Sequence, residues 1–214
     1  MLSARATLRP DTGLWAATPT ALEPIRVNNQ DYLILAAAGS GSLSVIATNA
    51  LGELTVVDHV IDDRTTRFAG VTAIATATYQ GQTWVFAAGS DDGITAFQVL
   101  DGGRLLSRGQ IADTEDMTLA NISALEARGD STGIDVFAAS ATEPGLTRLR
   151  FTIPAEDEVI LDSAEADTLT GGAGADVFVL GVDGEVDTIA DFTVGEDRVD
   201  LSDWAGLRLS LIHI

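Results

Sequence analysis

The sequence predicts an all-β protein with repeated four-stranded units followed by a glycine-rich, acidic segment. Three observations carry this prediction. Segments of the first two thirds recur with a period of about 51 residues. Within a period, short apolar or alternating runs are separated by clusters of Gly, Asp and Asn, and no amphipathic stretch is long enough for a helix. A nonapeptide, GGAGADVFV, then occupies residues 171–179.

The repeat is visible in separate segments of the chain. Residues 68–74 (FAGVTAI) return as residues 119–125 (LANISAL), 51 positions later. Residues 85–88 (VFAA) return at the same offset as residues 136–139, and a tetrapeptide AAGS recurs 50 positions apart. In the central unit we expect four strands, at residues 70–78, 83–88, 94–100 and 104–111.

A four-stranded repeat of this length is typical of a β-propeller blade, which buries both faces of its sheet against neighbouring blades. Residues 21–61 form the preceding unit, and residues 119–153 form a following unit that stops before its fourth strand. Residues 1–154 therefore hold about two and three-quarter blades, fewer than a closed propeller needs. We expect a piece of a longer protein, while an open stack of sheets and a partner-dependent arc stay open.

Aspartates recur in the loops of these units. Asp62, Asp63 and Asp113 stand at repeat spacing, which favours a role in fixing the loops over ligand binding. Asp91 and Asp92 precede a glycine, a pattern typical of a turn rather than of a carboxylate pair.

Composition excludes several classes of function. The chain carries 32 acidic and 12 basic residues, a net charge of -20, so we expect no nucleic-acid partner and regard metal cations as the natural counter-charge. No apolar run is long enough for a membrane span, and the absence of cysteine excludes disulfides and thiolate zinc sites. The first residues lack the apolar core of a cleavable secretion signal.

The nonapeptide indicates calcium. It has the pattern G-G-x-G-x-D-x-U-x, where U is bulky and apolar. Its glycines allow a tight turn that presents carbonyl oxygens, and Asp176 adds an anionic oxygen of the kind that calcium prefers. One turn supplies only part of a coordination shell, so a stacked turn is needed. Nine residues earlier, residues 162–170 keep Asp167 but lack the glycines.

From the nonapeptide to Trp204 the chain resembles the C-terminal cap of RTX (hemolysin-type) proteins, the calcium-binding modules of serralysin-type proteases and related type I secretion substrates. Residues 187–192 (DTIADF) and 195–202 (GEDRVDLS) carry the resemblance further. It implies a parallel β-roll at residues 155–208, Ca²⁺ as cofactor, a secreted protein and the type I secretion apparatus as a partner. The implied metal ligands are Gly171, Gly172, Gly174, Asp176, Asp167 and Asp187.

The function expected from the sequence is thus calcium binding that drives folding outside the cell. For five further acids, Asp183, Glu185, Asp191, Asp197 and Asp200, solvated surface is the favoured interpretation. Two other classes stay open: a fragment of a propeller hydrolase or lactonase-like enzyme, and an adhesion or surface-layer protein that uses its blades for protein contacts. His59 is the one histidine available for catalysis, because residues 209–214 resemble a translated sequencing adapter and are excluded from the fold.

Overall fold

A computed structural model, which describes residues 5–204, is all-β, with 48% of residues in strands and 3% in helices. The chain divides into two compact units, Met1–Thr152 and Ile153–Ile214. No helix within residues 5–204 has the length and apolar character needed to cross a membrane. The segment 209–214, interpreted above as an adapter, lies outside the described residues.

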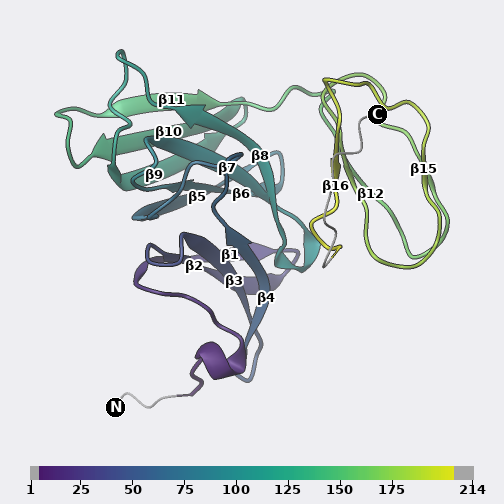
Figure 1. The fold of residues 1–214 in the computed structure, drawn as a ribbon, viewed down its shortest axis with the longest axis horizontal. Coiled ribbons are helices and arrows are strands. Elements are labelled where there is room, and N and C mark those ends of the chain that lie inside the picture. The colour runs from purple at the N-terminus through teal and green to yellow at the C-terminus, as the bar shows by residue number, and fades with distance from the viewer. Residues whose placement is uncertain (1–4, 205–214) are drawn as a thin grey trace. The chain divides into compact units, whose positions relative to one another are not determined.

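The first unit consists of three antiparallel sheets that follow one another in the chain (Figure 1). Sheet 1 is β1-β2-β3-β4, sheet 2 is β5-β6-β7-β8 and sheet 3 is β9-β10-β11. Their bounds are β1 Pro19–Val27, β2 Gln30–Ala37, β3 Ser42–Thr48, β4 Leu54–Ile61, β5 Ala73–Tyr79, β6 Gln82–Ala88, β7 Gly93–Val99, β8 Leu105–Ala112, β9 Ile122–Asp130, β10 Gly133–Ser140 and β11 Thr147–Phe151. Two 3₁₀ turns, η1 (Pro10–Thr12) and η2 (Asp101–Gly103), complete the unit.

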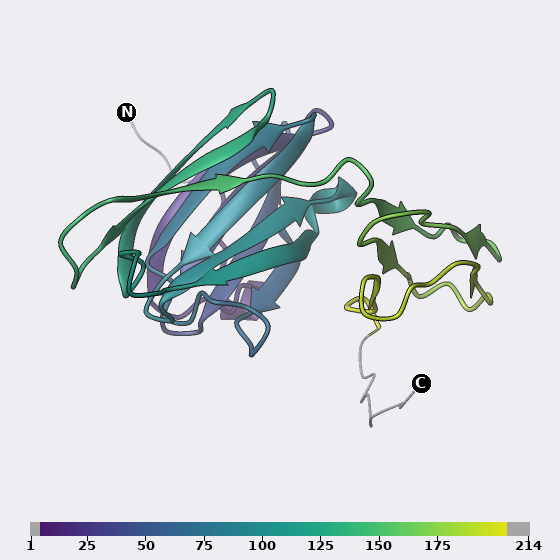
Figure 2. The same cartoon turned by 90° about the horizontal axis from the view of Figure 1, so that it is seen from above.

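The four strands expected in the central repeat, which forms sheet 2, are confirmed, each bound lying within three residues of its predicted position. The third repeat, which forms sheet 3, has the expected three strands. Figures 1 and 2 show the sheets stacked in chain order, and the first strands β1, β5 and β9 lie next to one another. A small residue allows β9 to approach β5: a Cβ at Gly129 of β9 would overlap the backbone carbonyl of Thr78 in β5.

The main core lies between sheets 1 and 2. Alternate residues of both sheets point into it, as expected for strands that bury one face against a neighbour. Phe68 and Phe97 meet there edge to face with ring centroids 5.6 Å apart, and both are almost fully buried. Ile34, Val45, Val85 and other aliphatic side chains fill the space around them.

The outer face of sheet 3 is charged rather than apolar. Arg150 forms ion pairs with Asp130 and Asp135, and Arg148 also pairs with Asp135. Hydrogen bonds from Arg150 and from the Thr132 N–H hold the pKa of Asp130 well below its usual range. This face is built to meet water, as at the polar end of a stacked array.

The recurring aspartates hold the loops that enter sheets 2 and 3. The Oδ1 atom of Asp62 accepts hydrogen bonds from the Phe68 N–H and the Thr66 hydroxyl, both at 2.9 Å. Asp113, 51 positions later, accepts the Leu119 N–H at 2.9 Å. The loop-fixing role expected for these residues therefore has a direct structural basis.

We predict that Asp113→Ala lowers the free energy of unfolding of the first unit by roughly 1–3 kcal/mol, because the N–H of the buried Leu119 loses a charged acceptor. Asp116→Ala, an exposed position in the same loop, serves as the control and should change stability by less than about 0.5 kcal/mol. Urea denaturation measures both. Equal effects of the two variants would contradict the role of Asp113.

The second unit has a different topology, in which the strands alternate between two short parallel sheets. The strands β12 (Val159–Leu161), β14 (Val177–Val179) and β16 (Arg198–Asp200) form one sheet. The strands β13 (Thr168–Leu169) and β15 (Thr188–Ile189) form the other. Leu169 and the three residues of β14 are buried. The chain therefore winds as a flattened coil whose turns lie along two edges.

Candidate metal centre

The turns of the second unit stack along two edges of the coil. The strands run between these edges, and Figure 1 shows them on opposite sides of the coil. We call the stack of residues 162–167 and 180–187 the first edge. The stack of residues 154–158, 170–176 and 190–197 is the second edge. The glycine-rich part of the nonapeptide belongs to the second edge, and its last three residues are β14.

The glycines of the nonapeptide are required by this turn for two physical reasons. Gly172 and Gly174 have φ of 93° and 115°, in the left-handed region that other residues rarely adopt. A Cβ at Gly171 would overlap the Asp176 carboxylate, and one at Gly174 would overlap the Glu156 carbonyl of the neighbouring turn. The turn thus lies tightly against both its own aspartate and the preceding turn.

Asp176 is the most deeply buried acid of the second unit, with 1% of its surface exposed. Its Oδ1 atom accepts the Glu158 N–H at 2.8 Å, whereas its Oδ2 atom is buried and has no hydrogen-bond partner within residues 5–204. A buried carboxylate oxygen without a partner is costly, because its charge has lost the solvation by water. The glycine cradle and this orphaned oxygen together fit a bound cation.

Other carboxylates of the second edge accept backbone N–H groups of the turn beside them. Asp197 accepts the Asp176 N–H at 3.0 Å through Oδ1 and the Thr193 N–H at 2.7 Å through Oδ2. Asp191 accepts the N–H groups of Gly171 and Gly172, at 3.0 and 2.8 Å. These hydrogen bonds tie successive turns together.

Two acids therefore differ from their interpretation as solvated surface. That interpretation is wrong for Asp197, which is only 9% exposed, and Asp191 is half-buried. The reason is the stacking of turns about 20 residues apart, where each turn leaves N–H groups that need acceptors. Asp183 and Glu185 are exposed, and Asp200 is half-buried and accepts the N–H and hydroxyl of Ser202.

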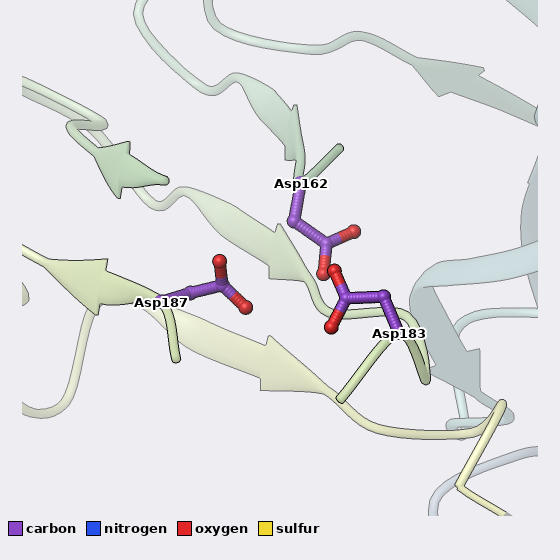
Figure 3. Close-up of side chains that lie close together, drawn as sticks. All are labelled: Asp162, Asp183 and Asp187. Atoms are coloured by element: carbon purple, nitrogen blue, oxygen red, sulfur yellow. The ribbon is translucent and has the colours of Figure 1, made fainter. Parts of the chain in front are cut away.

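The first edge gathers three carboxylates. Ligand oxygens of Asp162, Asp183 and Asp187 lie within 4.8 Å of one another, and Figure 3 shows the three side chains converging. Asp162 follows β12, Asp183 lies in the turn after β14 and Asp187 precedes β15. The three are half-buried or exposed, so this cluster is more open to water than Asp176.

Asp167 has a local role in the same edge. Its Oδ2 atom accepts the Ser163 N–H at 2.7 Å, and this hydrogen bond lowers the pKa of Asp167 below its usual value. Its own N–H donates to the Oδ1 atom of Asp187 at 3.0 Å. Asp167 and Asp187 thus belong to neighbouring turns of the first edge.

The six predicted ligands accordingly fall into two groups. Gly171, Gly172, Gly174 and Asp176 lie together on the second edge, while Asp167 and Asp187 lie on the first. Sequence reasoning missed Asp162 and Asp183 as members of the first-edge cluster. The signal that could have found them is the spacing of Asp167, Asp176 and Asp187, since the step from 176 to 187 is two residues longer than the step from 167 to 176. Those two residues enlarge the turn that carries Asp183.

A Ser–His contact in sheet 1 does not form an accessible catalytic site. The Ser44 hydroxyl lies 2.9 Å from Nδ1 of His59, but Ser44 is fully buried. The adjacent Asp58 accepts the backbone N–H groups of His59 and Leu105. These contacts are those of a packed sheet.

The sequence matches none of the protein-family models, and a search of curated proteins returns no match.

Proposed function

We propose that the second unit is a calcium-binding β-roll of the RTX type and that calcium drives its folding. The main support is the buried Asp176 carboxylate beside the glycine turn of residues 171–174, whose Oδ2 atom has no partner in the part of the chain that the structure describes. The alternation of strands between two parallel sheets supports the same proposal. Gly171, Gly172 and Gly174 would contribute carbonyl oxygens and Asp176 a carboxylate oxygen, a donor set suited to a hard divalent cation.

Charge supplies the coupling to folding. Residues 157–214 contain 14 acids and two arginines, so bringing these turns together concentrates negative charge. A bound divalent cation offsets that repulsion only in the folded state, and its binding free energy is then folding free energy. The first-edge cluster of Asp162, Asp183 and Asp187, next to Asp167, would provide a second and more exposed site.

The setting of this function is proposed from the same residues. Extracellular calcium modules bind at about 10⁻⁴–10⁻³ M, so such a unit would fold after export rather than before. We infer a secreted bacterial protein that leaves through a type I secretion apparatus. The three sheets of the first unit would be propeller-type blades of a longer protein.

The test is calcium-dependent unfolding of the full chain. We expect 10 mM calcium to raise the midpoint of one unfolding transition relative to EDTA, with a gain of about 2.7 kcal/mol if calcium stands at 100 times its Kd. Magnesium at the same concentration should do much less, because it demands a smaller octahedral site. Circular dichroism during thermal unfolding measures this, and coincident curves in calcium, magnesium and EDTA would refute the proposal.

A further inference from the structure

The outer edge of sheet 3 differs from that of its two sister sheets. In sheets 1 and 2 a fourth strand covers the third: β4 pairs with β3 and β8 pairs with β7. Sheet 3 ends at β11, which pairs only with β10 among the described strands. Burial reflects this difference. Every residue of β7 is buried, whereas none of the five residues of β11 is.

The sister sheets define which residues correspond. Val85 of β6 lies opposite Phe97, and Val136 of β10 lies opposite Leu149. The Thr147 hydroxyl accepts the Thr118 N–H at 2.9 Å, just as the Thr95 hydroxyl accepts the Arg67 N–H at 2.6 Å. Leu149 and Phe151 of β11 are therefore the counterparts of Phe97 and Val99 in β7.

A cavity of about 240 Å³ lies beside this edge, between sheets 2 and 3. Its wall is mainly apolar and includes Phe86, Ile94, Ile111, Leu149 and Phe151. The equivalent space between sheets 1 and 2 is filled partly by Leu105, the residue of β8 that lies opposite Val99 and is 6% exposed. The cavity is thus continuous with an apolar interface that a fourth strand completes in the sister sheet.

We propose that β11 binds an extended strand supplied by a partner chain, which becomes the fourth strand of sheet 3, antiparallel to β11. An aliphatic side chain opposite Phe151 would enter the cavity between sheets 2 and 3. Leu105 of sheet 2 fills the equivalent space between sheets 1 and 2. Arg148 alternates with Leu149 along β11, and its side chain is 64% exposed while it pairs with Asp135. A guanidinium has five N–H donors, so it can bind a second carboxylate beside Asp135. The fitting partner is therefore a strand that alternates aliphatic residues with acidic ones.

The probe is a fluorescent octapeptide that copies β8, Leu105–Ala112. It carries two changes, Leu106→Glu and Arg108→Glu, which place acids near Arg148 and Arg150 of β11. The control peptide carries Leu105→Asp in addition. We expect saturable 1:1 binding of the probe to the full chain by fluorescence anisotropy, and at least about tenfold weaker binding of the control. Hydrogen exchange of residues 147–151 should slow when the probe binds.

Protein variants locate the site. Leu149→Asp should abolish binding, while Arg148→Ala, on the other face of the same strand, should weaken it only a few-fold. The two-peptide comparison keeps the test decisive if Leu149→Asp fails to fold. Equal binding of both peptides, absence of binding up to about 1 mM, or protection of other strands in place of β11 would overturn the proposal. Self-association of the chain through β11 that excludes the probe would also overturn it, since a second copy would then be the occupant.

Discussion

Asp176→Ala is expected to remove most of the calcium-dependent stabilisation of the second unit. With the wild-type side chain, calcium at 100 times its Kd should add about 2.7 kcal/mol to the free energy of unfolding. The variant lacks the carboxylate whose buried Oδ2 atom has no partner among the described residues, so this increment should largely disappear. Unfolding of the full chain in calcium and in EDTA measures the increment directly.

The effect in EDTA should be much smaller than the effect in calcium. Without the cation, Asp176→Ala loses the hydrogen bond from the Glu158 N–H but also removes an uncompensated buried carboxylate. These changes act in opposite directions on stability. A purely structural role for Asp176 would give the same loss in both solutions, and that outcome would contradict its role as a ligand.

Glu165→Ala is the matched control. Glu165 is exposed on the first edge, and its removal eliminates the same unit of negative charge. The calcium increment should persist in this variant. If the two variants lost it equally, net charge rather than a ligand at position 176 would explain the calcium response.

Local pattern predicts the strands of the first unit well because the repeat supplies independent copies of the same signal. The Asp at 62 recurs at 113 in the loop that enters the next sheet, and the small residues at 37–40 recur at 87–90. The nonapeptide likewise predicts its own turn, since each glycine meets a specific steric demand. In these places local sequence and tertiary structure require the same residues.

The acids of the second unit could not be assigned in this way. Whether Asp197 is solvated depends on the turn about 20 residues earlier, where the Asp176 N–H needs an acceptor. Asp162 and Asp183 meet because they come from neighbouring turns of the first edge, 21 residues apart in the sequence. The charge of a residue does not say which turn will lie beside its own turn. Contacts between acids and N–H groups of neighbouring turns therefore become visible only in the folded coil.

Phe97→Ala is expected to be the most destabilising substitution in the first unit. Phe97 is 1% exposed and packs edge to face on Phe68 in the core between sheets 1 and 2. Removing a buried phenyl ring costs about 3–5 kcal/mol, through lost transfer free energy and the cavity left behind. A unit of this size gains only 5–15 kcal/mol by folding, so the variant should be close to unfolding.

The measurement is the unfolding midpoint, which should fall by roughly 6–20 °C at about 2–4 °C per kcal/mol. Leu22→Ala on β1, where the side chain is 53% exposed, should change it little. Because the two units have separate cores, the calcium increment should survive Phe97→Ala. If Phe97→Ala also abolished the calcium response, the two units would unfold as one cooperative body, and the independence of their cores would be wrong.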